Sequence, residues 1–295
     1  MRSRIRLLLT ATISTWLILL SANAFCQGNP ALTFKFTTVA VKGAMDTRIY
    51  GINNAGAMVG QYVDGSGVTH GLLLVKGKVT NVDDPNGNNT FCYGINTSGT
   101  IVGSYQDSGG NFHGFRYQNK VFTDIAPPGS TQPQAAGIND LGDIVGVYCV
   151  SSCAAGQQHG FLLKGSKYTQ LDAPNSLYTW AFGINKNQQI TLQGNDASGN
   201  WSGYVYKAGK YTKLKVPGST NTLATGIDSA GDVVMWWYDS TNIHHAALFS
   251  KGKYYKFDDP KGTSGTVADG INDHRLIVGV YHPTSTTAEG YKATY

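Results

Sequence analysis

Aromatic side chains in the second half of the chain are the residues best suited to chemistry, and the chemistry they offer is binding. Four of the five tryptophans fall between residues 180 and 237, at Trp180, Trp201, Trp236 and Trp237. Flat aromatic faces stack on sugar rings and also anchor protein partners, so this cluster favours a ligand site. Trp236 and Trp237 lie in a predicted strand, where we expect them in the core.

Loop positions near these tryptophans select the candidate binding residues. In a four-stranded repeat, the link into the next repeat and the loop after the second strand open on one rim. We predict that this rim holds a shared binding groove, in which aromatic rings stack on the ligand and polar side chains orient it. The predicted groove residues are Tyr178, Trp180, Asn195, Asp196, Asn200 and Trp201. The alternative is that the rings only fill space between sheets, because tryptophan is often partly buried without any ligand.

Acidic residues argue against a common class of glycan-cleaving enzyme. Glu289 is the only glutamate, which excludes a glycosidase built on a glutamate pair. The aspartate pairs Asp83-Asp84 and Asp258-Asp259 both precede proline at the same repeat position, where aspartate forms turns. We therefore predict no catalytic residue.

Histidines recur at the start of the same predicted strand in four copies of a repeat, at His70, His113, His159 and His245. One structural hydrogen bond in each copy explains this recurrence, since imidazoles away from water normally find partners. His244 and His245 are candidates for a metal site together with His282, but the positions of these histidines within the repeat give no reason for them to converge. We predict no metal site and no cofactor.

Two of the four cysteines, Cys149 and Cys153, lie in the only repeat that is three residues longer than its neighbours. Export favours oxidation, so we predict a disulfide between them in that loop. A zinc site that adds His159 lacks a fourth ligand at the usual spacing. Cys26 and Cys92 either pair or stay free, and their separation alone does not decide.

Basic residues do not form a nucleic-acid surface. The formal net charge is +5, but three of the arginines fall within the first six residues. Only Arg48, Arg116 and Arg275 remain beyond them, and the lysines lie at repeated hairpin turns. A phosphate-binding surface needs clustered basic residues on one face, so nucleic acid is excluded as a partner.

A six-fold repeat must position these residues. The stretch Gly-Ile-Asn (or Asp) begins at Gly51, Gly94, Gly137, Gly183, Gly226 and Gly270, with spacings between 43 and 46 residues. Within each copy, turn signals divide the sequence into four short strands, and a period near 40–45 residues is typical of a β-propeller blade. We predict an all-β, six-bladed β-propeller with four antiparallel strands per blade.

The two ends of the chain complete one another in this prediction. The sixth copy lacks a fourth strand, and Phe36–Val41 resembles one, so we expect this N-terminal strand to close the last blade and remove an exposed edge. Residues 1–24 resemble a signal peptide, with cleavage predicted after Ala24. The predicted domains are therefore the signal (1–24), a linker (25–33) and the propeller (34–295), with no transmembrane segment after signal removal.

The repeated motifs resemble the bacterial extracellular HAF repeat family, named for a His-Ala-Phe tripeptide within a Gly-Ile-Asn repeat. The tripeptide positions begin at His70, His113, His159 and His245, whereas the fourth and sixth copies depart, with Ser202-Gly203-Tyr204 and Glu289-Gly290-Tyr291. The resemblance covers nearly all of residues 34–295. It implies an exported, propeller-like protein and carries over no catalytic residue.

These observations favour an exported, non-enzymatic binding or scaffolding protein whose ligand is a glycan or another protein, located in the periplasm or outside the cell. One alternative is a secreted polysaccharide hydrolase or lyase that uses Asp or His groups near the channel. A second alternative is a surface structural protein that associates with copies of itself.

Overall fold

The computed structural model describes residues 32–151, 153, 154 and 156–295, and the unit Thr33–Tyr295 is built from twenty-four strands. No helix occurs among the described residues, so none there is long and apolar enough to cross a membrane. The predicted signal peptide and almost all of the linker 25–33 lie outside the described residues.

The strands follow the six repeats in order. The first repeat forms β2 (Asp46–Ile52), β3 (Met58–Val63), β4 (Thr69–Val75) and β5 (Lys78–Asn81). The second forms β6 (Asn89–Ile95), β7 (Ile101–Gln106), β8 (Phe112–Gln118) and β9 (Val121–Ile125). The third forms β10 (Thr131–Ile138), β11 (Ile144–Cys149), β12 (Gln158–Lys164) and β13 (Lys167–Leu171).

The fourth repeat forms β14 (Tyr178–Ile184), β15 (Ile190–Asn195), β16 (Trp201–Lys207) and β17 (Lys210–Leu214). The fifth forms β18 (Asn221–Ile227), β19 (Val233–Tyr238), β20 (His244–Ser250) and β21 (Lys253–Phe257). The sixth forms β22 (Thr266–Ile271), β23 (Leu276–Thr284) and β24 (Thr287–Thr294), and β1 (Lys35–Val39) completes its sheet.

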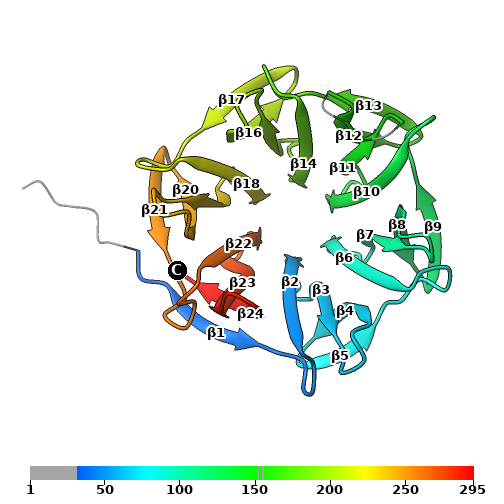
Figure 1. Cartoon of the computed structure of the whole chain (residues 1–295), viewed down its shortest axis with the longest axis horizontal. Coiled ribbons are helices and arrows are strands. Elements are labelled where there is room, and N and C mark those ends of the chain that lie inside the picture. Colours follow the sequence, from blue (N-terminus) through cyan, green and yellow to red (C-terminus); the bar gives the residue numbers. More distant parts are fainter. Residues whose placement is uncertain (1–31, 152, 155) are drawn as a thin grey trace, which may run out of the picture. The chain divides into compact units, whose positions relative to one another are not determined.

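The sheets surround a central opening, and the first strand of each repeat lies nearest to it (Figure 1). Four sheets have four strands each, whereas β10–β17 form one eight-stranded sheet. The count of separate four-stranded sheets is therefore four, which corrects the predicted six. The third and fourth repeats share one sheet because a single parallel pair, Gln158 with Tyr178, joins β12 to β14.

The recurring turn between the first two strands forms as its sequence predicts. In the first repeat, Asn53 Oδ1 accepts a hydrogen bond from Ala57 N at 2.9 Å, and Gly56 takes a φ of 78°. Gln188 and Arg275 replace that glycine, yet they adopt the same left-handed conformation, with φ of 56° and 59°. The turn chemistry of the Asn thus overrides the steric cost of the side chain.

Glycine in the inner strands permits close approach around the channel. Every inner strand has a register shift at this glycine. In β2, β6, β10 and β22 the shift ends at the glycine, and in β14 and β18 it spans the glycine. A Cβ added to Gly137 would lie 2.2 Å from the Phe182 carbonyl oxygen of the next repeat. A bulge and a close backbone approach, the two usual reasons for glycine inside a strand, therefore both occur here.

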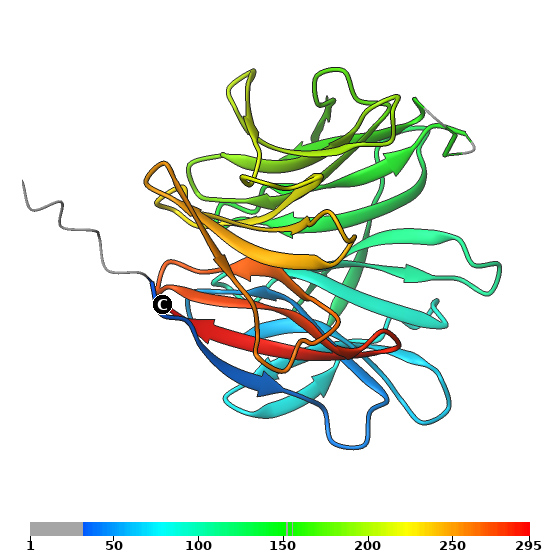
Figure 2. The ribbon, with the colours of Figure 1, turned by 60° about the vertical axis from the view of Figure 1, so that its left-hand side comes forward.

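The N-terminal strand closes the ring as predicted. β1 pairs antiparallel with β24 in unbroken register, from Lys35 opposite Thr294 to Val39 opposite Gly290. Figure 2 shows β1 and β24 side by side, the first and last strands of the described chain. Phe34 also stacks on Phe257 of the fifth repeat, with ring centroids 4.2 Å apart.

The recurring histidines make the structural contacts expected of them. His70 Nδ1 lies 2.9 Å from Asp83, and His245 Nδ1 lies 2.8 Å from Asp258, in equivalent places. His159 pairs in the same way with Asp172 at 2.7 Å. The first aspartate of each Asp-Asp-Pro segment therefore fastens its repeat's histidine and is not part of a shared site.

Candidate functional site

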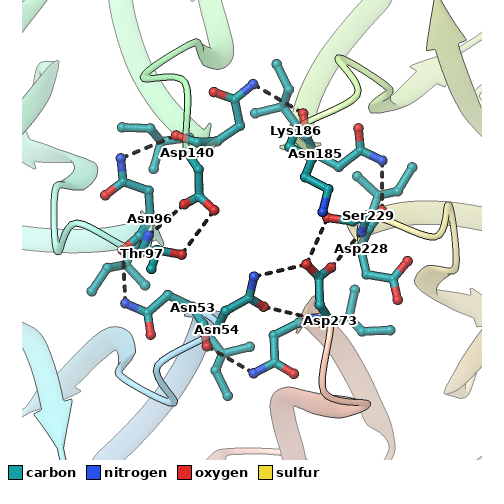
Figure 3. A pocket seen from close by; sticks show the side chains of 18 residues that line it. Asn53, Asn54, Asn96, Thr97, Asp140, Asn185, Lys186, Asp228, Ser229 and Asp273 are labelled. Atoms are coloured by element: carbon teal, nitrogen blue, oxygen red, sulfur yellow. Dashed lines mark hydrogen bonds between the residues drawn. The ribbon is translucent and has the colours of Figure 1, made fainter.

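The turns after the inner strands form a polar ring at one end of the central channel (Figure 3). The side chain of Asn53 donates from Nδ2 to the carbonyl oxygen of Asn96 in the next repeat at 2.9 Å, and Asn96 donates in turn to Asn139 at 3.3 Å. Asn139, Asn185 and Asn272 continue the pattern, and Asn272 closes the circle onto Asn53. These amides tie adjacent repeats together, so this end of the channel is primarily structural.

One link in this ring is absent because Asp228 occupies the place of the asparagine. An ionised carboxylate has no N–H to donate, and Asp228 uses Oδ1 to accept from the backbone N–H groups of Ala230 and Asp232. Burial raises the pKa of Asp228 above its ordinary value. The fifth and sixth repeats are instead joined by Ser229, whose backbone N and Oγ both donate to Asp273.

A cavity lined largely by aromatic side chains, which we call the aromatic cavity, has a volume of about 430 Å³. Its lining comes from strands of the fourth, fifth, sixth and first repeats: Arg48, Tyr50, Trp180, Phe182, Gln193, Trp201, Leu223, Thr225, Trp236, Tyr238, His244, Val267, Asp269, Val280 and His282. Tyr50, Phe182, Thr225 and Asp269 also line the central channel, so they form the boundary between the two spaces.

Trp180 and Trp201 meet at one side of the aromatic cavity. Their ring centroids lie 5.5 Å apart at an interplanar angle of 65°, an edge-to-face arrangement favoured by the aromatic quadrupole. Trp180 Nε1 donates to Gln158 Oε1 at 2.6 Å, which fixes the indole. Trp236 packs edge-to-face against Tyr238 at 5.4 Å and completes the aromatic lining.

A carboxyl group without a partner lies among these rings. Asp269 Oδ2 is buried and makes no hydrogen bond within the described part of the chain. Burial raises the pKa of the Asp269 carboxyl to about 8, and the Arg48 guanidinium opposes that rise. The charge of Arg48 is itself matched, because Asp46 accepts hydrogen bonds from its Nε at 3.0 Å and from its Nη2 at 3.1 Å.

Two histidines also converge on the aromatic cavity, which the repeat phase does not indicate. The rings of His244 and His282 lie 5.1 Å apart and edge-to-face, so the expectation that they do not converge is wrong. They come from neighbouring repeats whose strand ends meet at the same rim. His245 points elsewhere and stacks on Trp237 at 4.7 Å. No group of three metal-ligating side chains occurs among residues 32–295 as described.

Both cavity histidines are neutral near pH 7. Burial, and after it the charge of the adjacent His282, lower the pKa of His244 to about 4. Burial also lowers the pKa of His282, and Arg48 acts in the same direction. His282 Nδ1 lies 3.2 Å from the Thr287 carbonyl oxygen.

The structure separates the six predicted binding residues. Trp180 and Trp201 line the aromatic cavity, whereas Asp196 and Asn200 line a second cavity of about 290 Å³, which Trp201 also borders. Asp196 and Asn200 form the hairpin turn there, with Asn200 N donating to Asp196 Oδ1 at 3.0 Å. Asn195 is buried in β15 opposite Tyr178, and neither lines either cavity.

Sequence reasoning missed several lining residues. Trp237 lies in the core as expected, but Trp236, its neighbour on the same strand, faces the cavity. Side chains alternate along a strand, so adjacent tryptophans must face opposite ways, and this signal was present. The sequence indicates Arg48 and Asp269 less clearly. Both are charged residues at inner-strand positions where the other repeats have mostly apolar residues.

The predicted disulfide joins Cys149 and Cys153, with a Cα–Cα distance of 4.8 Å that is ordinary for such a bond. Cys92 is a free, buried thiol within the described residues, and burial raises its pKa. Cys26 lies outside the described residues, so a pairing of Cys26 with Cys92 stays a prediction.

No protein-family model matches the chain, and no curated protein matches it significantly. Among solved structures, the chain is similar to the SapL1 lectin in complex with α-methyl fucoside, with 10% identity over 84% of this chain and 93% of that one, and a TM-score of 0.55. A point mutant of the Aleuria aurantia lectin in complex with Fucα1-6GlcNAc matches at 10% identity over 87% and 93% of the two chains, with a TM-score of 0.53. A putative gluconolactonase matches at 12% identity over 88% and 92%, with a TM-score of 0.52. At such identities the likeness establishes a β-propeller-like fold.

Proposed function

We propose that the protein binds a glycan, without converting it, in the aromatic cavity. The observation that carries this proposal is the convergence of Trp180, Trp201 and Trp236 on one space of about 430 Å³. That volume falls in the range of small-molecule sites, and exposed aromatic faces suit the apolar faces of sugar rings. The ligand's hydroxyl groups would find Gln193 and Asp269 among the lining residues.

Similarity to two lectins supports a carbohydrate as the ligand, since both were solved with fucosides bound. We also infer an exported protein of the HAF repeat type. The basic and apolar first 24 residues and the Cys149–Cys153 disulfide support export, because disulfides persist in oxidising compartments. Counted by repeats, the eight-stranded sheet comprises two four-stranded units, which supports a ring of six blades.

Tryptophan fluorescence tests the proposal, because three of the four tryptophans beyond the first 24 residues line the cavity. Titration of residues 25–295 with soluble oligosaccharides is expected to give a saturable change. Trp180→Ala and Trp201→Ala are each expected to weaken binding by about tenfold or more, since central aromatic anchors carry much of a binding energy.

Trp237→Phe is the matched control, because Trp237 is buried in the core and lies outside the cavity. This variant is expected to keep the parent's affinity. Sugar binding that survives loss of both Trp180 and Trp201 would place the ligand elsewhere and overturn the proposal.

A second candidate function rests on Asp269. A carboxyl with a pKa of about 8, in a cavity that His282 and Tyr50 also line, is suited to act as a general acid in a polysaccharide hydrolase or lyase. Incubation with plant and bacterial polysaccharides separates the candidates, because an enzyme accumulates product with time and a binding protein does not. Activity with a pH–rate profile that shifts in Asp269→Asn would favour the enzyme.

A further inference from the structure

The aromatic cavity combines several aromatic faces with one acidic group whose Oδ2 is buried. Trp180, Trp201, Trp236 and Tyr238 line the cavity, and Asp269 lies where it meets the channel. Asp269 Oδ2 is enclosed and has no hydrogen-bond partner among the described residues. An enclosed carboxyl without a partner is costly to maintain, so a ligand that supplies a partner gains the interaction that the empty protein lacks.

None of the other charged and titratable groups near Asp269 forms an ion pair or a hydrogen bond with its side chain among the described residues. From β2, Arg48 is held by Asp46 in a two-point ion pair, and the pKa of Tyr50 is raised by burial, so that this phenol stays neutral. His244 of β20 and His282 of β23 are neutral because burial lowers their pKa values. From β24, Tyr291 is neutral as well, since burial raises its pKa.

We propose that the ligand is an amino sugar, or a glycan that contains one, whose protonated amine binds the Asp269 carboxylate between the aromatic faces of the cavity. Aromatic faces attract cations, and a desolvated cation gains more from them than an exposed one. The carboxylate neutralises the ammonium and accepts its hydrogen bond, which is stronger than one between neutral groups. This inference rests on the proposed glycan binding and narrows its ligand class.

Binding of an ammonium group has a defined pH dependence. Below pH 8 the free protein holds Asp269 mainly protonated, whereas the bound ammonium requires the ionised form, so binding releases a proton. Affinity for the amino sugar should therefore rise about tenfold for each pH unit between about pH 4.5 and 6, where the amine stays protonated. A neutral sugar has no such requirement, and its affinity should not rise.

The test compares three oligosaccharides of equal length, made of β-1,4-linked glucosamine, N-acetylglucosamine or glucose, titrated by calorimetry against residues 25–295. We expect the glucosamine oligomer to bind at least about tenfold more tightly than the other two at pH 7. Asp269→Asn should abolish that preference and the pH dependence, because it removes the carboxylate and preserves the shape. Asp124→Asn, an exposed aspartate of β9, is the charge-matched control and should change neither.

The outcomes separate the two proposals. Neutral oligomers that bind as tightly as glucosamine, through Trp180 and Trp201 and indifferent to Asp269→Asn, would overturn the amino-sugar inference and leave glycan binding intact. Failure of all three oligomers and of the wider sugar panel to bind would overturn both. The pH profile of the parent protein decides the question even if Asp269→Asn folds poorly.

Discussion

At the scale of single residues, two aspartates break the repeat pattern and have opposite consequences. Asp269 stands where Tyr50, Tyr93 and Phe182 stand in other repeats, and it gives the aromatic cavity an unmatched acid. Asp228 stands where five repeats have asparagine, and it interrupts the ring of amide hydrogen bonds. The first change adds a chemical group to a cavity, and the second removes a fastening between repeats.

Asp228→Asn is expected to stabilise the protein by about 1 kcal/mol, the typical net value of a hydrogen bond. The new Nδ2 can donate to the Asn272 carbonyl oxygen and close the ring, while Oδ1 still accepts from Ala230 and Asp232. Thermal unfolding at pH 7 should show a rise in Tm of about 2–4 °C. Asp124→Asn, which removes an exposed charge, is the control and should leave Tm unchanged.

The raised pKa of Asp228 also predicts how the stability of the protein changes with pH. Because burial raises its pKa, the folded state binds this proton more tightly than the unfolded state does. The stabilisation is complete below the unfolded carboxyl pKa of about 3.9 and is lost as pH rises through the higher folded pKa. The Asp228→Asn variant has no carboxyl to ionise at this position and does not lose this stabilisation. The difference in the free energy of unfolding between the variant and the parent should therefore grow from pH 4 to 7. An advantage that stays constant with pH would contradict this assignment.

At the scale of strands, pairs of large and small residues across the second and third strands shape the packing. Gly146 lies opposite Phe161, and Met235 lies opposite Ala247, so the fifth repeat exchanges the two sizes. Leu192 of the fourth repeat instead faces Tyr204. Met235, which replaces a glycine of other repeats, therefore fills space in the core opposite Ala247. Trp236 beside it lines the aromatic cavity.

Gly146→Ala is expected to destabilise the protein by about 1–3 kcal/mol through overpacking. An added Cβ would lie 2.0 Å from the Gln134 carbonyl oxygen and 2.7 Å from the Phe161 ring. Urea denaturation gives the free energy of unfolding, and Gly65→Ala is the matched control because a Cβ there meets nothing within 4 Å. Equal stability of the two variants would show that β11 relaxes more easily than its contacts indicate.

At the scale of the whole described unit, one short strand closes the ring. β1 pairs with β24, and Phe34 reaches Phe257 of the preceding repeat. Lys261 Nζ also donates to Thr38 Oγ1 at 2.9 Å. Residues more than 200 positions apart are thus held together by backbone pairing and aromatic contact.

Removal of residues 1–40 is expected to lower Tm and cause aggregation relative to residues 25–295, because it exposes the edge of β24. Static light scattering during heating measures both effects. Adding a synthetic peptide of residues 33–41 should partly restore Tm, since it can pair with the exposed strand. A shortened protein that melts like the parent and stays monomeric would contradict a closing role for β1.

The repeated pattern in the sequence was sufficient to predict the strands, the closing strand and the Cys149–Cys153 disulfide. These features depend on local sequence or on which repeat follows which, and both are visible in the chain. The same pattern placed Trp180 and Trp201 near each other, because it indicated which loops share a rim. The participation of these two residues in ligand binding stays a prediction.

Only the tertiary structure decided which other side chains join them. His244 and His282 meet, and Trp236 and Asp269 line one cavity, because the ring brings strands of neighbouring repeats around a common opening. Asp196 and Asn200 are close to Trp201 in sequence, yet they line a different cavity, which Trp201 also borders. Sequence spacing determines the strand on which a residue lies, but the distance between strands of different repeats depends on how the sheets pack.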